Sequence, residues 1–142
     1  MSATTAPRAS RAWAAALTIG ITALAVVAGA IHWSLGGLMF TLSALGYFAL
    51  AAAFLVGATV THPLVVRFSW APRVALIGYA AFSIVAWMVL GGFYWLGYLT
   101  KALEIALIVL VIVDIYRVYG GLNGLIQQAL GSLRWLISLI GR

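Results

Sequence analysis

Few residues in this chain carry groups capable of acid–base or ligand chemistry, and four of them form two pairs. Of its 142 residues, only 7% are charged and 65% are hydrophobic. Lys101 and Glu104 lie three residues apart, and Asp114 and Arg117 repeat that spacing. Residues so spaced share one face of a helix, so the sequence predicts two ion pairs. Charged groups inside a bilayer are costly unless paired or hydrated, which makes both pairs candidate sites.

His32 is the third polar residue expected at the depth of Lys101 and Glu104. If the helices that carry them are neighbours, the three form an outer-face polar cluster. Such a cluster could bind an anionic head group, a quinone carbonyl or a proton. The alternative, which the sequence favours, is structural. In that interpretation Lys101 is simply neutralised by Glu104, while Arg117 extends its charge to the interface beside Asp114.

Histidine also ligates haem iron and the magnesium of chlorophyll. A haem held by two histidines needs both at compatible depth, and His62 is expected on the opposite side of the membrane from His32. We therefore predict no bound cofactor, with a single pigment or a quinone as the alternative. The chain has no cysteine, no spaced metal ligands, no catalytic triad and no phosphate-binding glycine loop. We expect no metal site, no catalytic residues and no enzymatic activity.

Long apolar runs must position these residues. Each has about 20 residues, enough for a helix to cross a hydrocarbon core of about 30 Å. Helices are expected because backbone groups in lipid must satisfy one another. The runs cover residues 13–33, 38–60, 74–98 and 99–119. The sequence predicts an all-α membrane protein whose residues 13–119 form a domain of four transmembrane helices.

The connections set the order of these helices. Residues 34–37 allow only a very short turn, so the first two helices are expected to be antiparallel neighbours. Residues 61–73 contain two prolines and two arginines and are predicted to be the one substantial internal loop. Gly91 and Gly92 are expected to soften or end the third helix near its outer face.

Residues 1–12 are polar and small, and they are predicted to be a cytoplasmic tail. Arg8 and Arg11 precede the first apolar run, and Ala28-Gly29-Ala30 fits a signal-peptidase site, so a signal peptide is the alternative. The run exceeds the roughly 7–15 apolar residues of a signal peptide. We therefore expect an uncleaved first helix.

Basic residues predict the orientation in the cell (inner) membrane. With the N-terminus inside, the inner side holds every arginine and the outer side holds only Lys101. This asymmetry follows the positive-inside rule and places both termini in the cytoplasm. Tryptophans are expected near span ends, as in interfacial aromatic belts. They are Trp13, Trp33, Trp70 and Trp95, and the inner arginines are Arg8, Arg11, Arg67, Arg73, Arg117, Arg134 and Arg142.

Residues 120–142 differ from the apolar runs, because polar residues recur along one side of the predicted helix. This pattern predicts an amphipathic helix that lies along the cytoplasmic membrane surface or docks on a partner. A fifth span is the alternative, and it would place the C-terminus outside. The apolar side carries Leu122, Leu125, Ile126, Leu133, Leu136, Ile137 and Ile140; the polar side carries Asn123, Gln127, Arg134 and Ser138.

Several short motifs resemble an uncharacterised family of small four-helix integral membrane proteins of bacteria and archaea. The resemblance covers residues 30–117, and its most specific part sets a lysine and a glutamate at a helix start. It implies the architecture and draws attention to His32, Lys101 and Glu104 together. The motifs are Ile31-His32, Phe40, Leu45-Gly46-Tyr47-Phe48, Gly78-Tyr79 and Gly97-Tyr98-Leu99-Thr100-Lys101-Ala102-Leu103-Glu104.

The basic residues are scattered rather than clustered, so no nucleic-acid partner is expected. Few residues in the middle of the predicted transmembrane helices carry ionisable or reactive groups. The small and aromatic residues of these helices suit contacts between helices. We therefore expect a non-catalytic accessory subunit of a larger membrane assembly, respiratory or photosynthetic, with the bilayer and other membrane subunits as partners. One alternative is a self-associating protein that binds a lipid, quinone or pigment at the outer cluster. Another is a small oligomeric transporter or channel.

Overall fold

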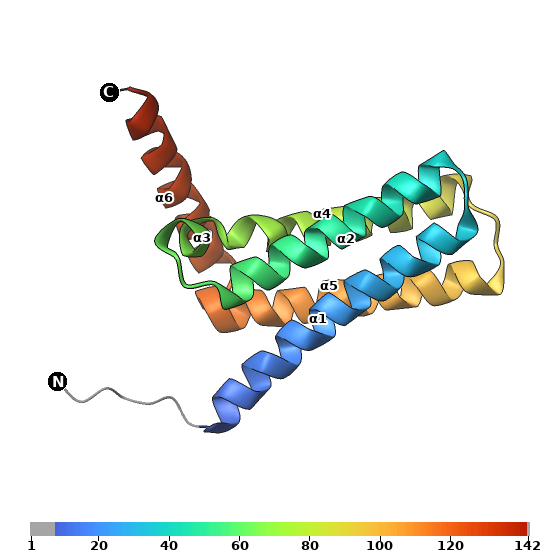
Figure 1. The fold of residues 1–142 in the computed structure, drawn as a ribbon, viewed down its shortest axis with the longest axis horizontal. Coiled ribbons are helices and arrows are strands. Elements are labelled where there is room, and N and C mark those ends of the chain that lie inside the picture. Colours follow the sequence, from blue (N-terminus) through green and yellow to red (C-terminus); the bar gives the residue numbers. More distant parts are fainter. Residues whose placement is uncertain (1–7, 142) are drawn as a thin grey trace.

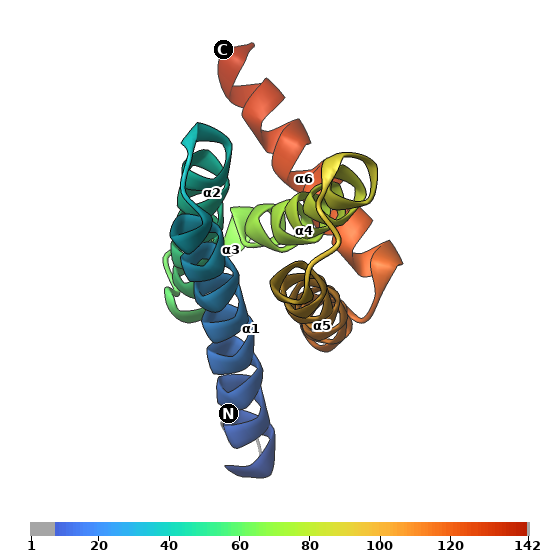
Figure 2. The same cartoon turned by 90° about the vertical axis from the view of Figure 1, so that its right-hand side faces the viewer.

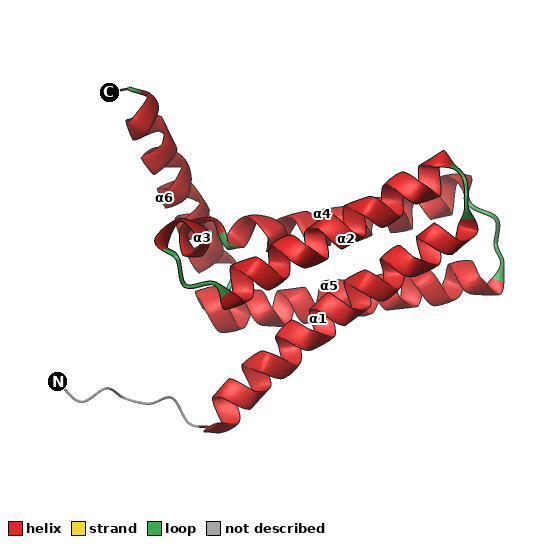
Figure 3. Cartoon of the chain, in the orientation of Figure 1, coloured by secondary structure: helices red, strands yellow, loops and turns green. Residues whose placement is uncertain are grey.

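The computed structural model describes residues 8–141 and shows their regular structure to be entirely helical (Figure 3). The helices of this part of the chain are α1 (Arg8–Leu35), α2 (Leu38–Thr59), α3 (Pro63–Phe68), α4 (Trp70–Leu90), α5 (Trp95–Tyr119) and α6 (Leu122–Ile140). Within that range, four stretches are long and apolar enough to cross a membrane: residues 10–35, 38–59, 63–90 and 95–119. The prediction of a multi-pass helical membrane protein is confirmed.

The helix boundaries correct the sequence prediction in three places. The first helix begins at Arg8, inside the predicted tail; residues 1–7 of that tail lie outside the described residues. The third long helix ends at Leu90 rather than at residue 98, because Gly91 takes an extended conformation and closes it; the expected interruption at Gly91 and Gly92 is thus confirmed. Residues 95–98 therefore belong to the start of α5.

The predicted loop over residues 61–73 is largely helical. The His62 side chain caps α3 by accepting a hydrogen bond from the Leu64 amide (3.3 Å), and Pro63 occupies the first helical turn. Only Ser69 separates α3 from α4. Arg73, expected in the loop, therefore lies in the first turn of a membrane-spanning helix.

The four long helices form a closed bundle (Figures 1 and 2). Helix α1 packs on α2 and α5, and α4 packs on the same two helices. The first two helices are antiparallel neighbours, as predicted, and are joined at Gly36 and Gly37. Both glycines have positive φ (69° and 82°), a conformation that a side chain would strain. We call the end of the bundle with this turn and residues 91–94 the turn end.

Close helix contacts depend on small residues. A Cβ atom at Gly29 would lie 2.7 Å from the Phe48 ring, so α1 and α2 can approach only because position 29 has no side chain. The buried core contains Ile21, Tyr47, Phe54, Leu76 and Leu107.

The last helix, α6, leaves the bundle at the end opposite to the turn end and runs across its long direction (Figure 1, red). Ser132 fastens it to α3 and α4: its hydroxyl lies 2.8 Å from the Arg67 carbonyl of α3 and accepts from the Trp70 indole of α4 (3.3 Å), and it also lies 2.7 Å from the Gln128 carbonyl of its own helix. The Arg67 guanidinium also stacks over the Trp135 ring at 4.7 Å. Residues 122–140 are thus helical, and their position on a membrane surface stays a prediction.

Candidate functional site

Glu104 is the centre of a buried polar cluster near the turn end. Its Oε1 accepts hydrogen bonds from the hydroxyls of Tyr47 and Ser83, each at 2.8 Å. Its Oε2 accepts from Lys101 Nζ at 2.6 Å. Lys101 Nζ also donates to Ser83 Oγ at 2.7 Å. Because both carboxylate oxygens accept hydrogen bonds, the arrangement is that of an ionised glutamate beside a protonated lysine.

His32 joins this cluster from α1, whose packing against α5 brings the two helices together. Its Nε2 lies 3.8 Å from Glu104 Oε1, and its ring lies 5.4 Å from the Tyr47 ring. Its Nδ1 donates to the Ala28 carbonyl at 2.8 Å, a bond that orients the ring. The structure therefore brings His32, Lys101 and Glu104 together, as the outer-face interpretation of the sequence required.

Each long helix contributes to the cluster: His32 comes from α1, Tyr47 from α2, Ser83 from α4, and Lys101 and Glu104 from α5. All but Ser83 are buried, and Glu104 is fully inaccessible. The sequence did not single out Tyr47 or Ser83 as site residues. A tyrosine hydroxyl in an apolar span needs a partner, and that was the signal available.

A cavity of about 430 Å³ lies against this cluster. Its polar lining includes His32, Ser83 and Lys101, with Ser43 and Thr100 beside them, whereas Glu104 and Tyr47 lie behind Ser83 and Lys101. Its remaining wall is mainly apolar and aromatic, and includes Phe40, Phe82, Tyr79 and Trp87. The site thus combines a partly open apolar pocket with a few convergent polar groups, the usual composition of a small-molecule site.

A second charged cluster lies toward the opposite end, around Asp114. Its Oδ1 accepts from Arg117 Nη2 (2.6 Å) and Nε (3.0 Å), so the predicted Asp114–Arg117 pair is present. Its Oδ2 accepts from Arg73 Nε at 2.8 Å. Arg73 also donates to the Ser69 carbonyl at 2.6 Å and is only 2% exposed. The view of Arg73 as a loop residue that only anchors the topology is therefore wrong.

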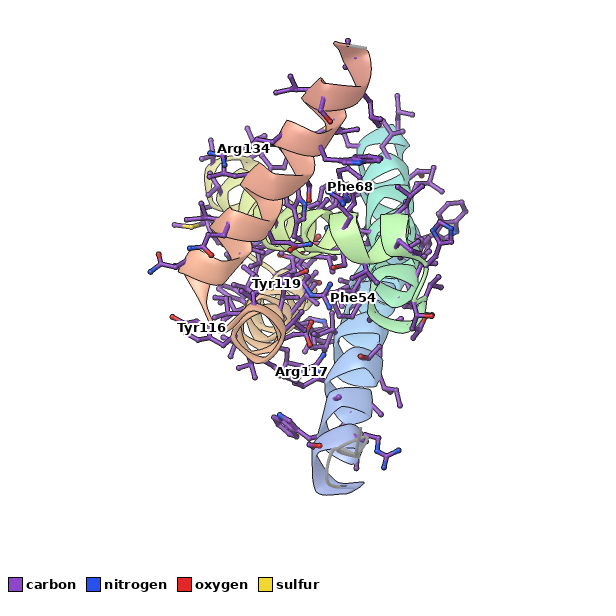
Figure 4. The ribbon with its side chains drawn as sticks, turned by 90° about the vertical axis from the view of Figure 1, so that its left-hand side faces the viewer. Phe54, Phe68, Tyr116, Arg117, Tyr119 and Arg134 are labelled. Carbon is purple, nitrogen blue, oxygen red and sulfur yellow. The ribbon has the colours of Figure 1, made fainter. Side chains whose placement is uncertain are left out.

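Aromatic rings complete this second cluster. The Arg73 guanidinium lies 5.2 Å from the Phe54 ring and 5.7 Å from the Tyr119 ring. Figure 4 shows Phe54, Arg117 and Tyr119 around this end of the bundle. The arrangement ties α4 to α5 through Asp114 and packs Arg73 against a ring of α2, so we interpret it as structural.

The two histidines lie at opposite ends of the bundle: His32 is in the last turn of α1, and His62 caps α3. They cannot ligate one haem within a chain. No group of three or more metal-ligating side chains is found among the residues that the structure describes.

Comparisons of this chain with protein-family models, curated proteins and solved structures find no match. The resemblance described above stays a prediction. Any proposed function therefore rests on the geometry of the site.

Proposed function

We propose that this protein binds an amphipathic, lipid-soluble small molecule in the cavity at the turn end. The observation that carries the proposal is a partly open apolar cavity with a buried charged cluster against it. A volume of about 430 Å³ falls within the usual range for small-molecule sites, which is about 300–1,000 Å³. Apolar walls would hold the body of the ligand, and the side with His32, Ser83 and Lys101 would orient its polar group.

The charges of the cluster favour an uncharged ligand. Lys101 is already neutralised by Glu104 at 2.6 Å, and no further cation lines the cavity among the described residues. A phosphate or carboxylate would bring a negative charge into an apolar site without a compensating one, which is costly. A neutral polar group would gain hydrogen bonds at no such cost. This argument favours a neutral ligand over the anionic head group that the sequence left open.

The experiment is photo-crosslinking to the purified full chain in lipid nanodiscs. The probes are para-nonylphenol and its methyl ether, each with a photoreactive diazirine on the alkyl chain. Labelling should map to cavity residues on α2, α4 and α5. Ala86 lines the cavity, so Ala86→Phe should fill it and abolish labelling there. Ala75 is exposed on the same helix, so Ala75→Phe is the matched control and should leave labelling unchanged.

Failure of both probes to label the cavity, or labelling that Ala86→Phe leaves intact, would refute the proposal. A water-filled cavity would give the first of these results. The variants should be compared only after each elutes as a single folded species with unchanged helical circular dichroism.

The accessory-subunit function is a second proposal, and the course of α6 favours it. This helix leaves the bundle and exposes Ile126, Leu133 and Ile137. With its polar side toward the cytoplasm, it would lie along the inner membrane surface beside a partner subunit. Purification from native membranes in mild detergent tests this: stoichiometric co-purification of a membrane complex is expected, and recovery of the chain alone would contradict it.

A further inference from the structure

The imidazole of His32 presents an unused hydrogen-bond acceptor beside the cavity. Its Nδ1 faces the Ala28 carbonyl at 2.8 Å, and a carbonyl can only accept, so Nδ1 carries a hydrogen. In the neutral ring, Nε2 then holds a lone pair. The 3.8 Å between Nε2 and Glu104 Oε1 exceeds hydrogen-bond length, so the carboxylate does not occupy that position.

Ser83 is the one described hydroxyl within reach of His32 Nε2, and it is already committed. Its oxygen lies 2.8 Å from Glu104 Oε1 but 3.5 Å from His32 Nε2. A hydroxyl has one hydrogen, and the shorter contact to a carboxylate is the stronger bond. Among the described residues, His32 Nε2 is thus left without a donor, although the histidine is only 6% exposed. Such a buried acceptor is costly unless a ligand or water satisfies it.

Two unused donors lie around the same cavity. A lysine ammonium has three hydrogens, and the contacts of Lys101 to Ser83 and Glu104 account for two of them. Trp87 also lines the cavity, and its buried indole N–H has no partner among the described residues. The cavity therefore offers these two donors and the His32 acceptor to an incoming group, and the hydroxyls of Ser43, Tyr79 and Thr100 also line it.

We propose, on the basis of the binding function above, that the ligand carries a hydroxyl group on a lipid-soluble body. The hydroxyl would donate to His32 Nε2 and accept from Lys101 or Trp87. A hydroxyl matches this combination because it holds one donor and two acceptor positions. A quinone carbonyl only accepts and would leave His32 unsatisfied; an ether has the same defect. The aromatic walls formed by Phe40 and Phe82 suit a phenolic ring.

The test compares the two probes already described, in which a methyl group replaces the hydroxyl hydrogen. The phenol should compete for the cavity at about one-tenth of the concentration that the methyl ether requires; this ratio corresponds to about 1.4 kcal/mol. His32→Phe keeps a ring of similar size but removes the acceptor. It should abolish the preference while the methyl ether still binds.

His32→Gln offers a side-chain oxygen as acceptor and should restore part of the preference, which a purely structural role for His32 would not predict. Equal competition by the two probes in the unmodified protein overturns the hydroxyl assignment and leaves the binding function standing. A preference that survives in His32→Phe also overturns it. Labelling of the cavity by neither probe refutes the binding function itself. The comparison in the unmodified protein needs no variant to fold.

Discussion

Replacing Asp114 by asparagine tests whether the second cluster holds the bundle together. The carboxylate is fully buried and accepts from two arginines. Asp114→Asn keeps the shape of the side chain but removes the negative charge between them. Arg117 is about one-third exposed (32%) and can reach the interface, whereas Arg73 is confined beneath Phe54 and Tyr119. The variant thus leaves the charge of Arg73 buried and uncompensated.

The cost of removing one partner from a buried ion pair is about 3–5 kcal/mol, and we expect the free energy of unfolding to fall by that amount. Arg117→Gln should cost no more than about 1 kcal/mol, because that pair is partly exposed. Arg73→Met removes the buried cation and leaves Asp114 paired with Arg117, so its cost should be intermediate. Adding Arg73→Met to Asp114→Asn should restore stability relative to Asp114→Asn alone, since no uncompensated charge then stays buried.

The measurement is equilibrium unfolding of the full chain by SDS titration in mixed micelles, followed by circular dichroism and tryptophan fluorescence. The outcome depends on whether adding Arg73→Met to Asp114→Asn raises or lowers stability. If the double variant is less stable than Asp114→Asn alone, or if Arg117→Gln is as damaging as Asp114→Asn, the assignment of the buried charge to Arg73 is refuted.

Three further predictions concern the cavity wall and α6. A Cβ atom at position 97 would lie 2.7 Å from the indole nitrogen of Trp87, which lines the cavity. Gly97→Ala should therefore reduce probe labelling and lower the free energy of unfolding by about 1–3 kcal/mol. Position 78 is open, so Gly78→Ala should leave labelling unchanged and should not lower stability, because alanine favours a helix over glycine. Ser132→Ala removes the hydroxyl's contacts with Arg67 of α3 and Trp70 of α4 and should increase proteolysis between α5 and α6; Ser138→Ala is the control, because Ser138 bonds within its own helix. The chain has no cysteine, so single cysteines can report the surroundings of α6: Ser138→Cys should react with an impermeant maleimide added from the cytoplasmic side, and Ile137→Cys should be protected. Equal reactivity would contradict the interfacial position.

Local properties of the chain were predictable from the sequence. An apolar run of sufficient length must form a helix in lipid, so the four spans followed from composition alone. The pairing of Lys101 with Glu104, and of Asp114 with Arg117, followed from a spacing of three residues within one helix. Helix ends were less predictable: the glycines at 91 and 92 indicated the interruption of the third helix, but the cap at His62 depends on a single residue inside a mixed stretch.

The partners between helices were decided only by the tertiary structure. Tyr47 and Glu104 are 57 residues apart, and Arg73 and Asp114 are 41 apart. In a soluble bundle an apolar stripe would show which face of each helix points inward. In a membrane, lipid is as apolar as the protein interior, so hydrophobicity does not reveal the rotation of a helix about its axis. The packing of small residues such as Gly29 sets that rotation. It therefore decides which polar side chains meet, and it leaves His32 Nε2 unpaired beside a cavity that no sequence pattern indicated.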